Sequence, residues 1–181
     1  TTPVSAGGRG GENNASAVWE VFRNNDSHAF DFYQTVSGLP NGTYTVKVQA
    51  FFRDGDAGTS STKVEPVLYA GDKSTTIHSI LDGALPSKPS WQWGHNGSKG
   101  WIPNDMWQAN QWFKAGHYVV TLENVTVTNG TLKIGIKNTS TATSMAWCCF
   151  DNFQLYYHGT AQGDLRTSAL YKRIKATADE A

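Results

Sequence analysis

Apolar and polar residues alternate along most of the chain with the period of two that is typical of half-buried β-strands. The clearest run is 43–53, whose apolar residues share one parity: Tyr44, Val46, Val48, Ala50 and Phe52. Further strands are predicted at 28–36, 64–69, 76–81, 119–128, 131–137 and 147–157. Asn129-Gly130 joins two of these runs and is a strong β-hairpin signal. Leu39-Pro40-Asn41-Gly42 predicts another turn.

One internal segment has helical spacing instead. Met106, Ala109 and Phe113 fall on one face of a short helix at 105–114, and Gly116 follows as its C-terminal cap. A single helix among about seven to nine short strands predicts an all-β jelly-roll β-sandwich. The clean alternation predicts that each sheet has one buried and one solvated face.

The ends of the chain differ from this body. Residues 1–18 are rich in Gly, Asn, Ser and Ala, which predicts a flexible lead-in. Residues 159–181 are rich in Ala, Lys and Arg, which predicts a linker, a C-terminal helix or a disordered end. The sandwich domain is therefore expected at 19–158, as an excised or mature segment of a longer protein.

Charge narrows the possible partners. Fifteen basic residues balance fifteen acidic ones, so there is no net attraction to nucleic acid. No apolar run approaches 18 residues, so we expect no membrane insertion. Only 17% of residues are charged, and the resulting polar but uncharged surface favours an extracellular protein, secreted or at the cell surface.

The last strand carries two features with alternative interpretations. Cys148 and Cys149 are neighbours, so we expect one in the core and the other on the opposite face. Asp151 shares strand parity with Trp147 and Leu155, and without a bulge its carboxylate points into the core. A buried carboxylate needs hydrogen bonds or a cation, which leaves backbone amides and a Ca²⁺ ion as alternative partners.

Motifs for catalysis are scarce. The sequence contains no Gly-x-Ser-x-Gly, no His-Glu-x-x-His and no phosphate-binding loop. Asp54 and Asp56 could form the carboxylate pair of a glycosidase, but they lie in a glycine-containing loop. We therefore expect a protein that is not an enzyme.

Tryptophan is concentrated in one region. Five of the seven fall between 91 and 112: Trp91, Trp93, Trp101, Trp107 and Trp112. Their neighbours are mostly Gly, Asn, Ser and Lys, and Trp107 and Trp112 lie off the predicted buried face of the helix, so at least one should be exposed. Grouped exposed aromatics mark binding sites, although packing of a long loop onto the sandwich is the alternative.

A sugar fits these residues better than a nucleic acid. Indole rings match the apolar face of a pyranose, and polar side chains match its hydroxyls. Single-stranded nucleic acid would need a positive groove, and only three lysines lie nearby. The candidate hydrogen-bonding residues are Arg53, Asp54, Asp56 and Gln111.

Several segments together resemble the galactose-binding-like β-sandwich modules appended to secreted polysaccharide-degrading enzymes of Bacteroidetes. They are Phe32-Tyr33-Gln34-Thr35-Val36, Leu68-Tyr69-Ala70-Gly71-Asp72, Ile102-Pro103-Asn104-Asp105-Met106, Phe113-Lys114-Ala115-Gly116-His117-Tyr118 and Phe150-Asp151-Asn152-Phe153-Gln154-Leu155. The resemblance spans about residues 18–158. It implies a non-catalytic carbohydrate-binding module and a structural Ca²⁺ with Asp151 among its ligands. The N-terminal strand that usually supplies further ligands in such modules is not recognisable here.

Three hypotheses follow. In the first, the chain binds plant cell-wall polysaccharide, such as xylan or β-glucan, and tethers a catalytic domain of the same parent chain. In the second, it is a structural spacer or protein-interaction module of a multidomain surface protein. In the third, it is a small glycan-active enzyme that uses an acid pair.

Overall fold

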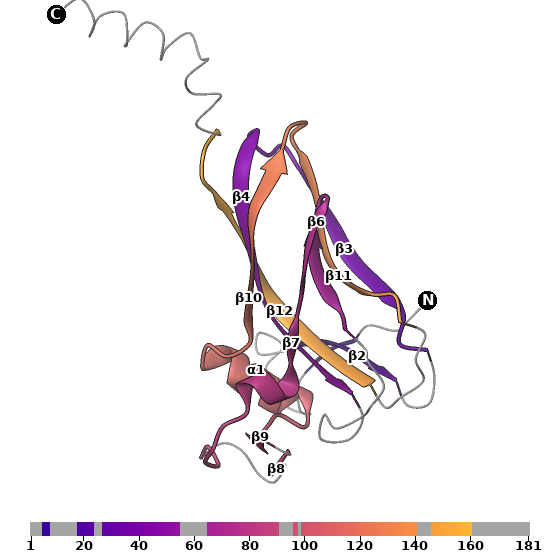
Figure 1. The fold of residues 1–181 in the computed structure, drawn as a ribbon, viewed down its shortest axis with the longest axis vertical. Coiled ribbons are helices and arrows are strands. Elements are labelled where there is room, and N and C mark those ends of the chain that lie inside the picture. Colours follow the sequence, from indigo (N-terminus) through magenta and orange to yellow (C-terminus); the bar gives the residue numbers. More distant parts are fainter. Residues whose placement is uncertain are drawn as a thin grey trace, which may run out of the picture.

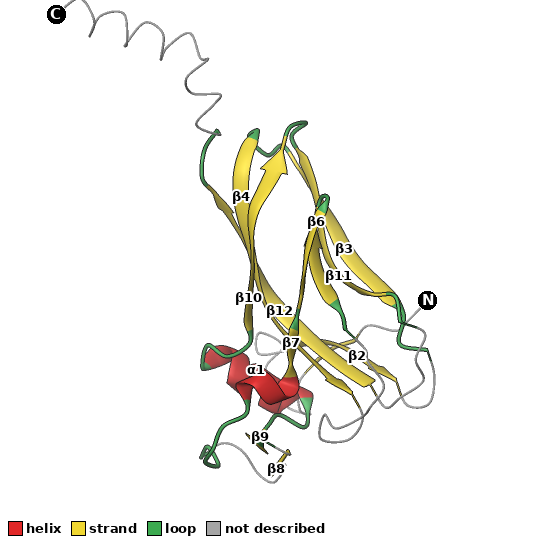
Figure 2. Cartoon of the chain, viewed as in Figure 1, coloured by secondary structure: helices red, strands yellow, loops and turns green. Residues whose placement is uncertain are grey.

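The structure is a computed structural model that describes residues 5–7, 18–23, 27–54, 65–90, 96–97, 99–140 and 146–160. Two β-sheets stack face to face, and a short helix lies at one end of the stack (Figures 1 and 2). This confirms the predicted all-β sandwich with one internal α-helix. Within the described residues, no helix is long and apolar enough to cross a bilayer.

The large sheet has the strand order β1-β2-β12-β4-β10, and a short strand, β7, pairs with β4 in parallel. Its strands are β1 (Ser5–Gly7), β2 (Val18–Arg23), β12 (Ala146–Tyr157), β4 (Gly42–Asp54), β10 (Val119–Val127) and β7 (His78–Ser79). The small sheet has the order β3-β11-β5-β6. Its strands are β3 (Phe30–Ser37), β11 (Thr131–Asn138), β5 (Val67–Ala70) and β6 (Lys73–Thr76).

Three further elements lie at the helix end of the sandwich. The helix α1 (Met106–Lys114) occupies most of the segment expected from the sequence. A 3₁₀ helix, η3 (Ile80–Gly83), and a two-stranded ribbon of β8 (Asn96–Gly97) and β9 (Gly100–Trp101) lie nearby (Figure 1). The strand predicted at 76–81 is therefore wrong in part, because Ile80 and Leu81 belong to η3.

The hairpin predicted at Asn129-Gly130 is also wrong. β10 pairs with β4 in the large sheet, whereas β11 pairs with β3 and β5 in the small sheet. The turn between β3 and β4 likewise carries the chain from one sheet to the other, and Leu39 N donates to Gly130 O at 3.0 Å between the two turns. A turn signal predicts reversal of the chain but not the sheet that receives the next strand, since each strand can bury its apolar face from either sheet.

The main core lies between the two sheets. Its residues come from the inward-facing positions of both: Val46, Val48 and Ala50 on β4 face Leu132, Ile134 and Ile136 on β11, among others. The alternation read from 43–53 therefore predicts the inward face correctly.

A second core lies on the outer face of the large sheet, where α1 and η3 cover it. It contains Phe51, Trp112, Tyr118, Trp147 and Cys149, with several smaller neighbours. The prediction of one solvated face per sheet is wrong at this end, because a helix packs on the second face. For the same reason both cysteines are buried, one in each core, and burial raises the pKa of both thiols.

A β-bulge in β12 separates Asp151 from Leu155, which the alternation places on one face. The register shifts between Asp151 and Gln154, and Asn152 takes a left-handed conformation with φ of 57°. Asp151 keeps the outer face that it shares with Cys149, while Leu155 returns to the main core. The carboxylate is therefore half-buried on the outer face and does not point between the sheets.

Candidate functional site

Three side chains form a row across the large sheet at the helix end. Trp147 on β12 pairs with Phe22 on β2 and, on its other side, with Arg53 on β4. Residues that are directly opposite in a sheet share a face, and Trp147 belongs to the second core, so the row lies on the outer face. Phe22 remains 43% exposed and presents its ring to solvent.

Polar contacts fix this row. The Arg53 guanidinium lies over the Trp147 indole at 4.9 Å from its centroid, and Nη1 donates to Asn104 Oδ1 at 2.8 Å. On the other side, the indole N–H of Trp147 donates to the Glu20 carboxylate at 2.7 Å. Arg53 and Trp147 are each held from two directions, so these two side chains are organised before any ligand arrives.

The start of α1 forms a wall beside the row. Asp105 caps the helix, since its Oδ1 accepts from Gln108 N at 2.8 Å. The Gln108 side chain in turn accepts from Asn104 N at 2.8 Å, which fixes the residue that contacts Arg53. The row and the start of α1 border a hollow of about 310 Å³, which we call the helix-end pocket. Its lining residues are Glu20, Phe22, Arg53, Asn104, Asp105, Met106 and Trp147.

The pocket combines apolar surface with directional polar groups. The Phe22 ring and Met106 offer apolar contacts, Arg53 offers N–H donors, and Asn104 and Glu20 offer acceptors. A pyranose presents both kinds of surface, so the combination suits a sugar. Both carboxylates already accept hydrogen bonds, Glu20 from the Trp147 indole and Asp105 from the N-terminus of α1. Each therefore positions another part of the protein.

Of the five tryptophans predicted as a platform, Trp112 is excluded by its burial, and the role of the others stays a prediction. Trp112 is fully buried, and its indole N–H donates to Gly83 O at 3.3 Å, so it packs the second core. Trp107 is half-buried on α1. Trp101 is half-buried on β9, beside Lys88. Trp91 and Trp93 lie outside the described residues.

The predicted hydrogen-bonding residues divide in the same way. Arg53 lines the helix-end pocket, whereas Asp54 is half-buried at the end of β4 and Gln111 is half-buried on α1, neither among the pocket's lining residues. Asp56 lies outside the described residues. The sequence reading missed Phe22, Trp147 and Glu20 as site residues, because only strand pairing brings them to Arg53.

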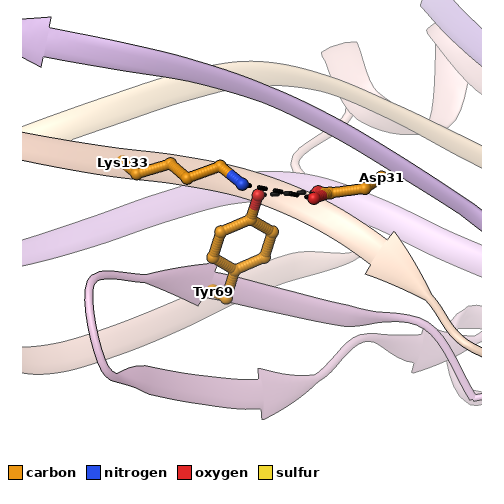
Figure 3. A network of polar contacts seen from close by, with 3 residues as sticks. All are labelled: Asp31, Tyr69 and Lys133. Atoms are coloured by element: carbon orange, nitrogen blue, oxygen red, sulfur yellow. Dashed lines mark hydrogen bonds and ion pairs between the residues drawn. The ribbon is translucent and has the colours of Figure 1, made fainter.

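A second polar cluster, on the outer face of the small sheet, serves the fold. Tyr69 donates to Asp31 Oδ1 at 2.6 Å, and Lys133 Nζ lies 3.3 Å from Asp31 Oδ2 (Figure 3). Burial and the hydrogen bond to Asp31 raise the pKa of Tyr69 to about 12. Lys133 Nζ also lies 3.6 Å from the centroid of the Tyr33 ring. These contacts join three strands, β3, β11 and β5, so we assign the cluster to sheet cohesion.

The described residues gather few ligands for a cation. Asp151 presents its half-buried carboxylate on the outer face. Within the described ranges, no group of three or more His, Cys, Asp or Glu side chains could hold a metal ion. The Ca²⁺ role of Asp151 stays a prediction from the resemblance.

Comparison with known proteins yields structural similarity alone. No protein-family model matches the sequence, and no curated protein matches it. Eight chains of solved structures match, among them the carbohydrate-binding module TmCBM61 in complex with β-1,4-galactotriose. That match has 16% sequence identity and a TM-score of 0.47, and it covers 87% of this chain and 90% of the other.

Proposed function

We propose that this chain is a non-catalytic carbohydrate-binding module that holds a sugar in the helix-end pocket. The observation that carries the proposal is the row of Phe22, Trp147 and Arg53, which places an exposed aromatic ring beside fixed polar groups. Sites for small ligands commonly combine apolar walls with a few placed polar groups. The Arg53 guanidinium can donate to a sugar hydroxyl while Phe22 packs on the C–H face of the ring.

The hydrogen bonds that the two carboxylates of the pocket already make favour binding over hydrolysis. A glycosidase needs one carboxyl group to donate a proton and another to act as nucleophile or base. Glu20 accepts the Trp147 indole N–H, and Asp105 accepts a backbone N–H of α1. Each carboxylate thus has a positioning task that a proton transfer would disturb.

The biological setting of the module extends this proposal. Binding to plant cell-wall polysaccharide would raise the effective substrate concentration of a catalytic domain in the same parent chain. Such a parent would be secreted or held at the cell surface. A structural Ca²⁺ at Asp151 belongs to the same proposal.

Affinity gel electrophoresis tests the binding directly. We expect retardation of the folded protein on at least one of galactan, xylan, β-glucan, mannan and pectin. Phe22→Ala should weaken retardation about tenfold, because it removes the ring contact. Phe153→Ala is the matched control, since Phe153 is 40% exposed on the same sheet but lies outside the pocket.

Three results would contradict the proposal. Equal losses in the two phenylalanine variants would move binding away from the helix-end pocket. Product release from any polymer, with loss in Glu20→Gln, would favour the enzyme. Absence of retardation on every polymer, with a native circular dichroism spectrum, would favour the spacer module. Repeating the gels with EDTA tests the Ca²⁺ proposal separately.

A further inference from the structure

Beyond α1, the outer face of the large sheet carries a chain of hydrogen-bonded side chains. Tyr156 donates its hydroxyl to Gln154 Oε1. Gln154 Nε2 donates to Asn152 Oδ1 at 3.0 Å, and Asn152 Nδ2 donates to Gln49 Oε1 at 3.2 Å. The chain runs from the open part of β12 toward the C-terminal end of the helix.

Gln49 decides which group donates and which accepts in this series of hydrogen bonds. Its Nε2 donates to two carbonyl oxygens, Phe113 O at 2.6 Å and His117 O at 3.1 Å, just inside and just after the end of α1. Both of its N–H groups are thereby used, so its oxygen must accept and Asn152 must donate. The side-chain oxygens of Asn152 and Gln154 then act as acceptors within the chain. Each of these two amides keeps a second N–H beyond the one that the chain uses.

A hollow of about 320 Å³ lies over these groups. Its lining residues are Lys47, Val48, Gln49, Phe113, Gly116, Val119, Asn152 and Gln154, and we call it the amide hollow. Among these lining residues, all of them described, there is no Asp or Glu. The Lys47 ammonium lies 5.3 Å from the centroid of the Tyr156 ring, which is 45% exposed and lies outside this lining.

These groups favour an anionic ligand. Lys47 offers a cation, and Asn152 and Gln154 each offer an N–H, while each amide oxygen already accepts one hydrogen bond within the chain. A carboxylate is an acceptor with several lone pairs, and its hydrogen bonds to an ammonium are charge-assisted. Val119 and the Tyr156 ring add apolar surface that a sugar ring can contact.

We propose that the amide hollow is a second binding site that takes a sugar carboxylate, as in a hexuronic acid of an acidic polysaccharide. Lys47 pairs with the carboxylate, Asn152 and Gln154 donate to it or to a neighbouring ring oxygen, and Tyr156 contacts the ring. The helix-end pocket contrasts with it, because two carboxylates, Glu20 and Asp105, line that pocket. This proposal stands without the helix-end pocket, since the two sets of lining residues do not overlap.

Isothermal titration calorimetry with tetragalacturonate and with neutral β-1,4-galactotetraose tests the proposal. We expect the full chain to bind tetragalacturonate and the affinity to fall as salt rises. Lys47→Gln should weaken this binding about tenfold and flatten its salt dependence. Asn152→Gly should also weaken it, and it tolerates the left-handed backbone at that position.

Lys137→Gln is the matched control. Lys137 also lies over a tyrosine ring, at 4.9 Å from the Tyr69 centroid, but on the small sheet. An unchanged affinity in this variant supports the proposal, and a loss equal to that of Lys47→Gln would overturn it. No binding of tetragalacturonate to the wild-type chain would overturn it as well.

Phe22→Ala separates this site from the helix-end pocket. Retained tetragalacturonate binding in Phe22→Ala supports the amide hollow, whatever happens to the neutral sugar. Loss of tetragalacturonate binding in Phe22→Ala, with native stability, would place the uronate in the helix-end pocket and overturn the proposal. Failure of neutral sugar binding alone would count against the proposed function and leave this site standing.

Discussion

The two halves of β12 have the same strand conformation but different surroundings. From Ala146 to Phe150 every residue is buried, because the main core covers one face and the second core covers the other. From Asp151 to Tyr157 no residue is fully buried. β2 pairs only with the first half, and α1 packs at the same end. Both proposed sites use β12, one at the covered half and one at the open half.

The comparison separates two ways of holding a binding site. At the covered half, Trp147 is held between a core and the pocket, so its position is set by packing. At the open half, the side chains of Asn152 and Gln154 are held by hydrogen bonds to one another. We therefore expect the helix-end pocket to be coupled to global stability and the amide hollow to be much less so.

Trp112→Ala should have the largest effect on this contrast. The side chain is fully buried in the second core, and truncation should lower the free energy of unfolding by about 4 kcal/mol. Tyr156→Ala, in the open half, should cost less than about 1 kcal/mol. Urea denaturation monitored by circular dichroism measures both, and equal losses would show that the second core adds no special stability.

Lowering the pH should lower the free energy of unfolding through His28, which contacts Val21 on β2. His28 is fully buried, its Nε2 lies 3.3 Å from Val21 O, and Asn138 Nδ2 lies 3.3 Å from its Nδ1. Burial lowers the pKa of His28, and the positive charge of Arg23 adds to this, against an opposing hydrogen bond to Val21. The neutral ring fits the site, since Nε2–H can donate while Nδ1 accepts.

The sign follows from proton linkage. In the unfolded chain His28 binds a proton near pH 6.5, whereas the folded structure lowers its pKa. The free energy of unfolding therefore keeps its full value above that pH and decreases as the pH drops below it. One proton limits the slope to about 1.4 kcal/mol per pH unit. Urea midpoints from pH 8 to 5 measure this, and His28→Gln should flatten the profile. An unchanged profile in that variant would assign the pH dependence to other groups.

The bulge should give the smallest effect. Asn152→Ala and Asn152→Gly remove the same side-chain hydrogen bonds, but only glycine accepts the left-handed backbone without strain. We expect the alanine variant to be less stable than the glycine variant by about 1 kcal/mol in thermal unfolding. Equal stability would mean that the strand straightens in the alanine variant.

The sequence predicted the parts of the fold that depend on local pattern. Alternation in 43–53 identified the inward face of β4, and the helical spacing of Met106, Ala109 and Phe113 located α1. The local pattern did not predict burial on the outer face of the large sheet, where α1 and η3 form a second core. The spacing gave α1 one buried face, whereas Trp112 is also buried, because it packs in the second core and its indole N–H donates to Gly83 O of η3.

The site was predictable only in part. Arg53 was among the candidate hydrogen-bonding residues, and it lines the helix-end pocket. Phe22 and Trp147 lie 125 residues apart in the chain, and nothing local to either indicates that they pair. The directed chain through Gln49 and Asn152 likewise depends on the register of β12 against β4 and on the bulge.

By itself, the amino-acid sequence indicated most of the longer strands but not β2, and it determined the helix, the neutral charge and the aromatic richness, because these follow from the identity and spacing of residues. The tertiary structure decided which sheet receives each strand, which face of β12 is covered twice, and which side chains meet at the two pockets. The physical reason is that burial of an apolar stripe is non-directional. A stripe can be buried against either sheet or a helix, and only the packing of the whole chain selects among them.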